Sequence, residues 1–220
     1  MYLRYGELTS FSSNSFTDNT SAAIGVNSTQ ASNIDNSTAF SGNGWDGVEI
    51  FSSSINDELT WTDLSGDASY HIIGDVSIAS GGLTIDPGTK MEFDEDVKLD
   101  VNSDGYLSAS GNSSNMITFT TSNEAGQIYW KGIKFGSQDA RNELNYVHVK
   151  FGGGAQHDLS EFKNIKTAVS GNNNGNLTLT NSVIENSEGY GVYFQGSIND
   201  IESAGANNTF NNNPSGNFYN

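Results

Sequence analysis

The sequence predicts a right-handed parallel β-helix of roughly nine coils, each about 22–26 residues long. Short stretches in which apolar and polar residues alternate occur along most of the chain. No stretch keeps the apolar spacing of an amphipathic helix over three turns. A unit that begins with Asn recurs near both ends at a nearly constant spacing. Together these three observations indicate an all-β solenoid.

The alternation predicts short strands with one buried face, because successive side chains of a strand point to opposite sides. The clearest examples are residues 76–78, 83–85, 91–93, 97–101, 107–109, 117–119, 133–135 and 177–179. Gly, Asn, Asp and Ser separate these stretches, as expected for turns.

The repeated unit is Asn followed by Ser or Thr, an apolar strand, a polar turn and a second apolar strand. Copies occupy residues 14–26, 36–51, 181–194 and 208–219. A leucine-rich repeat has a similar period, but its Leu spacing is absent. Stacked coils would place equivalent Asn residues about 4.8 Å apart, so we expect their amides to form ladders.

The middle of the chain carries more specific motifs. YHIIGDVSI occupies residues 70–78, LTIDPGT residues 83–89, ITFT residues 117–120 and WKGIKF residues 130–135. This order resembles the right-handed parallel β-helix repeat proteins, with a pectate-lyase-like fold, found among surface and secreted proteins of Bacteroidetes and marine bacteria. The resemblance covers residues 70–153. It implies the fold but no single function, because this fold supports many activities.

Residues 52–69 interrupt the repeat. We therefore expect residues 1–51 to form the terminal coils of one stack, residues 52–69 to connect, and residues 70–220 to form a second stack. A coaxial arrangement of the two stacks as one domain remains open. Exposed terminal coils are expected to allow edge-to-edge self-association.

Composition limits the partners and the compartment. The net charge of −17 excludes nucleic acid as a partner, because phosphate binding needs clustered Lys and Arg. No apolar run is long enough for membrane insertion, and no signal peptide is visible. The absence of Cys fits many exported bacterial proteins, and we expect an extracellular or cell-surface location.

One segment suggests a metal. Asp100, Asn102 and Asp104, followed by Gly105, fit the D-x-N-x-D-G pattern of calcium loops. The twelfth position is Gly111, where such a loop needs a carboxylate. An ordinary turn is the competing interpretation, and no other cofactor is expected.

Aromatic residues are candidates for stacking on a sugar. Trp61, Trp130 and Tyr193 are the ligand-stacking candidates, and the wider group also contains Trp45, Tyr129 and Tyr190. Packing in the core or at coil corners is the competing interpretation.

Catalytic signals are weak. Acidic clusters at residues 57–58 and 94–96 suggest a polysaccharide lyase or glycoside hydrolase, which would need converging carboxylates and a base on one sheet. His71, His148 and His157 have no zinc-site spacing, and His71 and His148 are expected at outward positions.

The function predicted from the sequence is a non-catalytic extracellular β-helix module of a larger exported bacterial protein. Its role would be that of a stalk, an adhesin-like unit or a module that contacts a polysaccharide or cell-surface glycan. The first alternative is a lyase or hydrolase on the same fold. The second is an ice-binding solenoid, suggested by the Thr-x-Thr pairs at residues 118–120 and 178–180.

Overall fold

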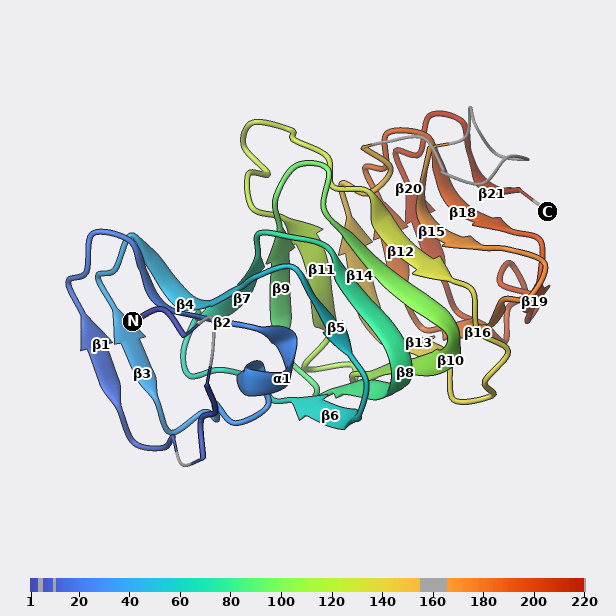
Figure 1. Cartoon of the computed structure of the whole chain (residues 1–220). Coiled ribbons are helices and arrows are strands. Elements are labelled where there is room, and N and C mark those ends of the chain that lie inside the picture. Colours follow the sequence, from blue (N-terminus) through green and yellow to red (C-terminus); the bar gives the residue numbers. More distant parts are fainter. Residues whose placement is uncertain (4–5, 10, 155–165, 220) are drawn as a thin grey trace.

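A computed structural model describes residues 1–3, 6–9, 11–154 and 166–219. The chain forms a right-handed parallel β-helix of about eight turns (Figure 1). The predicted fold class is confirmed, with about one turn fewer than the sequence suggested. No helix of the described residues is long and apolar enough to cross a membrane.

The first face of the solenoid is an eight-stranded parallel sheet. In spatial order it contains β2 (Ala22–Val26), β4 (Trp45–Ile50), β7 (Ser69–Ile72), β9 (Lys90–Phe93), β11 (Ile117–Thr121), β14 (Val147–Lys150), β17 (Val183–Glu185) and β20 (Thr209–Asn211).

The second and third faces are two arms of one eleven-stranded sheet. They are continuous because β8 (Val76–Ile85) and β10 (Lys98–Ser110) run through the corner between them. The second face adds β5 (Ser53–Ile55), β12 (Gly132–Phe135), β15 (Thr167–Gly171), β18 (Tyr190–Phe194) and β21 (Gly216–Tyr219). The third face adds β6 (Glu58–Trp61), β13 (Glu143–Asn145), β16 (Asn176–Thr180) and β19 (Ser197–Ile198).

The N-terminal coils depart from this plan. β1 (Ser15–Thr17) and β3 (Ala39–Ser41) form a separate two-stranded sheet at one end of the rod (Figure 1). A single helical turn, α1 (Ser28–Ala31), contacts β5. Asn27 caps α1 by accepting a hydrogen bond from the Gln30 amide.

The core is a set of inward columns in which apolar side chains of successive coils stack in register. Along the first face, Val48 pairs with Tyr70, and Tyr70 pairs with Met91. Phe119 and Val149 continue the column, and all five side chains are buried. This confirms the period-two prediction and leaves the alternate residues outside.

Coil length varies more than the sequence suggested. Equivalent residues are 24 apart at Asn19 and Asn43, and 26 apart at Asn181 and Asn207. Leu107 and its partner Asn142 in the next coil are 35 apart. The expectation of 22–26 residues for every coil is therefore wrong for the middle of the chain. Between Leu107 and Asn142 the additional residues lie at the corners, because the strands of this coil still pair in register with their neighbours.

Strand pairing continues through residues 52–69. This segment holds β5 and β6, both of which pair with β8. On the first face, β4 pairs directly with β7. The backbone ladders thus pass from the N-terminal coils to the later ones without a gap.

Asparagine amides join the coils at the corners, as predicted. Asn207 donates to Asn181 at 3.2 Å, and Asn212 donates to Asn186 at 3.1 Å. These four residues have left-handed backbone conformations with φ of 50–54°. Asn tolerates this region better than most residues, which explains its position at the turns.

A second group of asparagines takes the place of a backbone peptide group. Asn213 accepts a hydrogen bond from the Ser187 amide and donates to the Ile184 carbonyl, both in the preceding coil. Asn208 likewise accepts from the Ser182 amide. Backbone pairing lapses where a coil turns, and the side-chain amide satisfies the groups left there.

Candidate functional site

The proposed calcium residues lie in a strand. Asp100, Asn102 and Asp104 all belong to β10. Asp100 is 8% exposed, and its carboxylate lies 3.1 Å from Lys98 Nζ and 3.6 Å from Lys134 Nζ. Both ammonium groups lie against Oδ2, whereas Oδ1 of the same carboxylate is buried and has no hydrogen-bond partner among the described residues.

The other two residues of that motif point to separate partners. Asn102 donates to Ser77 Oγ at 2.9 Å, whereas Asp104 is exposed and accepts a hydrogen bond from the Ser103 hydroxyl at 3.3 Å. The register of β10 against β8 shifts between Val101 and Asp104. The described residues contain no group of three or more His, Asp and Glu side chains placed to hold a metal ion. Calcium binding stays a prediction.

The two proposed stacking tryptophans lie inside the solenoid. Trp61 is 1% exposed and stacks on Tyr70 at 4.9 Å between ring centroids. Trp130 is 0% exposed and stacks on Phe93 at 4.1 Å. In these positions their rings pack the core and offer no face to a surface ligand. Tyr193 is also buried, but it lies on the outer side of the second face.

Two histidines on the outer side of the first face pair with carboxylates of the next coil. His71 Nε2 lies 2.7 Å from Asp94 Oδ1, and Ser122 donates to the same oxygen. Both hydrogen bonds lower the pKa of Asp94, and the hydrogen bond with His71 has the larger effect. His148 lies 2.9 Å from Glu185. Both His residues are outward-facing, as expected, while His157 lies outside the described residues.

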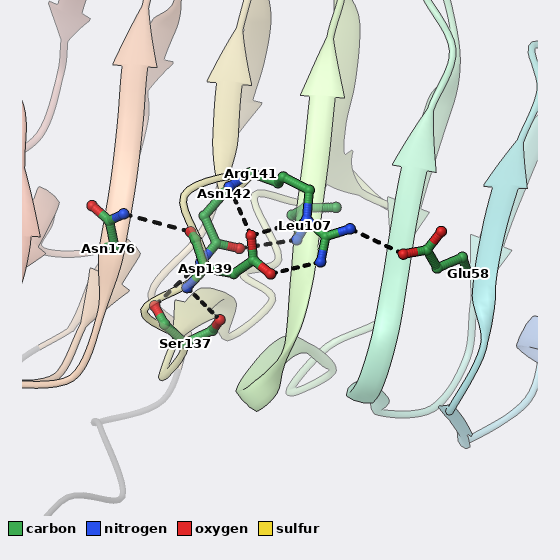
Figure 2. A network of polar contacts seen from close by, with 7 residues as sticks. All are labelled: Glu58, Leu107, Ser137, Asp139, Arg141, Asn142 and Asn176. Atoms are coloured by element: carbon green, nitrogen blue, oxygen red, sulfur yellow. Dashed lines mark hydrogen bonds and ion pairs between the residues drawn. The ribbon is translucent and has the colours of Figure 1, made fainter.

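A polar network crosses several coils on the third face (Figure 2). Arg141 contacts Glu58 at 2.9 Å and Asp139 at 2.7 Å. Its guanidinium lies 3.7 Å from the centroid of the Tyr106 ring. The hydrogen bonds from Arg141 lower the pKa of Asp139. Tyr106 in turn lies against Gly82, where an added Cβ would come within 2.0 Å of the ring.

Asn142 anchors this network from inside. Its side chain is completely buried; Oδ1 accepts from the Leu107 amide at 3.0 Å and Nδ2 donates to the Ser137 carbonyl at 3.2 Å (Figure 2). Asn176 donates to the Asp139 carbonyl from the next coil. The polar groups of this network form hydrogen bonds and ion pairs with one another. We therefore interpret the network as structural, because it stabilises the corner at residues 136–142.

The candidate site is a groove of about 480 Å³ at the corner between the first and second faces. Successive corners of the solenoid contribute its walls, and none of its nine lining residues is charged. They are Gln127, Tyr129, Phe151, Asn186, Ser187, Asn212, Asn213, Pro214 and Asn217.

Two aromatic rings form one part of the groove. The centroids of Tyr129 and Phe151 are 6.1 Å apart, and the rings are inclined by 56°. Phe151 has a φ of 55°, which lies in the left-handed region. Asn186 and Asn212 occupy the same corner in the following coils and have the same conformation. A bulky side chain there costs on the order of 1–3 kcal/mol, and such strain is concentrated at functional sites.

Side-chain amides form the other part. Asn212 Nδ2 donates to Asn186 Oδ1, which leaves Asn186 Nδ2 and Asn212 Oδ1 without a hydrogen-bond partner among the described residues. Asn217 is exposed. An amide supplies both donors and an acceptor. The groove therefore combines apolar ring faces with free hydrogen-bonding groups of both kinds.

The sequence indicates only part of this site. Tyr129 is among the aromatic candidates, whereas no sequence motif assigns a ligand role to Phe151. Asn186 and Asn212 lie in copies of the Asn-led repeat, for which the sequence predicts only a structural role. The signal that was available is the phenylalanine at a corner where later coils have asparagine.

Comparisons with protein-family models, curated proteins and solved structures found no match. The function must therefore be argued from the site itself.

Proposed function

We propose that this chain is a non-catalytic extracellular β-helix module that contacts carbohydrate through the corner groove. It would serve as a stalk or adhesin-like part of a larger exported bacterial protein. The observation that supports this proposal is the combination of Tyr129 and Phe151 with five side-chain amides in one uncharged groove.

This combination suits the chemistry of a sugar. A pyranose ring presents C–H groups on its faces and hydroxyls at its edge. Aromatic rings pack against the faces, and amides both donate to and accept from hydroxyls. The rigid solenoid keeps these groups in place before the ligand arrives, which lowers the entropic cost of binding.

The test is a binding panel. Immobilised neutral polysaccharides (β-glucan, xylan and mannan) and acidic ones (alginate and polygalacturonate) are incubated with the chain, and retention is measured. We expect retention on a neutral polymer that falls at least about fivefold in Tyr129→Ala, a loss of roughly 1 kcal/mol. The control is Tyr2→Ala, which removes an exposed tyrosine at the opposite end of the first face.

Unfolding midpoints of both variants establish that they fold. Equal retention of Tyr129→Ala and the parent chain, or no retention on any polymer, would contradict the proposal. The enzyme alternative is examined in the same incubations by assaying new reducing ends and unsaturated products. A product that accumulates with time would favour a lyase or hydrolase over a binding module.

One observation favours the second alternative, ice binding. On the third face, the outward residues Thr60, Thr84 and Ser108 pair in register and present hydroxyls at the strand spacing. Glu143 then interrupts the column before Thr178. Thermal hysteresis of a concentrated solution, compared with that of Thr84→Lys, tests this alternative.

Calcium binding has a separate test. A calcium site in β10 predicts that millimolar calcium raises the unfolding temperature relative to excess chelator, and that Asp104→Asn removes the difference. An unchanged unfolding temperature would contradict that prediction.

A further inference from the structure

Three tyrosines lie beside the groove, on the outer side of the second face. Tyr193 of β18 pairs in register with Tyr219 of β21, and their rings are stacked at 5.0 Å with an interplanar angle of 11°. Tyr190 packs against Tyr219 at 5.4 Å with a tilt of 60°. We call Tyr193 and Tyr219 the tyrosine ledge.

The ledge is continuous with the groove through β21. Exposure alternates along this strand, so Asn217 and Tyr219 both face outward. Asn217 belongs to the groove lining. Residues two apart on a strand lie about 6.6 Å from each other, so the exposed ring begins roughly one sugar width beyond the last groove amide.

The ledge ring is exposed but held in place. Tyr219 is 46% exposed, whereas its neighbour Phe218 packs against the core. Stacking on Tyr193 fixes the orientation of the Tyr219 ring, and Gln195 donates to the Tyr193 hydroxyl at 3.3 Å. An exposed aromatic ring with a fixed orientation is suited to stacking, because little freedom is lost when a ligand packs on it.

Charge indicates the class of ligand. The nine groove residues and the tyrosines beside them are uncharged, in a chain with a net charge of −17. An acidic saccharide would approach a negative field without finding a cation in the groove to pair with. An uncharged saccharide meets no such penalty.

We propose that the tyrosine ledge is a second subsite, and that the module takes an uncharged oligosaccharide that begins in the groove and continues along β21 onto Tyr219. This inference rests on the proposed function, since it extends the same site. It predicts a dependence on chain length that the groove alone would not produce.

The experiment is a titration with uncharged β-linked glucose and mannose oligosaccharides, from disaccharide to hexasaccharide, followed by calorimetry or NMR shifts. For the parent chain we expect affinity to rise between the short and the long members. Tyr219→Ala should lower the affinity for the long members roughly 3- to 10-fold and leave the short ones unchanged. Tyr219→Phe, which keeps the ring, should behave like the parent chain.

The two proposals fail in distinguishable ways. If Tyr129→Ala weakens every member but Tyr219→Ala weakens none, the ledge is not a subsite and the proposed function stands. If no member binds to the parent chain, both proposals are overturned. Tighter binding of oligogalacturonates than of the uncharged series would overturn the ligand class. Tyr2→Ala again serves as the control for loss of an exposed tyrosine.

Discussion

Replacing Asn142 by alanine tests whether side-chain amides really substitute for backbone peptide groups at the corners. In the folded chain, Asn142 is completely buried and accepts a hydrogen bond from the Leu107 amide. It also donates to the Ser137 carbonyl, which accepts a second hydrogen bond from the backbone N–H of Asn176. The substitution therefore leaves one buried donor unpaired and removes one further hydrogen bond.

The expected loss of stability follows from these two terms. An unpaired buried N–H costs about 1–3 kcal/mol, and a lost hydrogen bond with a remaining partner costs about 0.5–1.5 kcal/mol. Together they predict that Asn142→Ala lowers the free energy of unfolding by roughly 1.5–4.5 kcal/mol. For a chain of this length, that corresponds to a fall of roughly 3–18 °C in the unfolding temperature.

A matched control makes the same change where water has access. Asn43 accepts from the Asn19 backbone amide and donates to the Phe16 carbonyl, the same pattern at a half-buried corner, where it also donates to the Asp46 carboxylate at 2.7 Å. We expect Asn43→Ala to cost no more than about 1 kcal/mol, because water replaces the lost partner. Urea unfolding followed by circular dichroism measures both variants. Equal losses in the two variants, or a loss below about 1 kcal/mol for Asn142→Ala, would refute the reasoning.

Three further predictions follow from local geometry. Gly82→Ala should displace the Tyr106 ring that lies against Gly82, and cost about 1–3 kcal/mol in urea unfolding with a changed near-ultraviolet circular dichroism signal. The hydrogen bond with His71 lowers the pKa of Asp94 from its ordinary value of 3.8. The ionised carboxylate therefore stabilises the fold above pH 3.8, and this stabilisation is lost as the pH falls through the lower pKa of the folded state. Urea midpoints between about pH 5 and pH 2 should therefore fall more steeply for the parent chain than for Asp94→Asn, and parallel curves would contradict this assignment. Tyr146 has a left-handed φ of 49°, so Tyr146→Asn should raise the unfolding free energy by up to about 1 kcal/mol, and a decrease would show that the ring contributes more than the strain costs.

The fold was predictable because each coil repeats the same physical pattern. Alternation of apolar and polar residues identifies strands such as β9 and β11, and repeated Asn motifs identify corners. Coil length in the middle was not predictable by the same means. The corner at residues 136–142 adds residues that belong to no strand, and only the three-dimensional structure shows that Asn142 returns the chain to register.

The site was less accessible from the sequence, because its parts are far apart in the chain. Tyr129 and Asn217 line the same groove although they lie in different coils. A tryptophan also looks the same in a sequence whether it is inside or outside, and Trp61 and Trp130 are inside. Side-chain direction at a corner depends on the local φ, which a period-two pattern does not report.

The corner asparagines also give the rod a direction. Asn208 and Asn213 both serve peptide groups of the coil before their own. Asn43, Asn142 and Asn199 also accept from a backbone amide of the preceding coil, so the asparagines at these corners act in one direction along the rod. Unfolding of a coil at the C-terminal side would leave backbone amides of the preceding coil without their side-chain partners. Local unfolding would therefore extend toward the N-terminus more easily than toward the C-terminus.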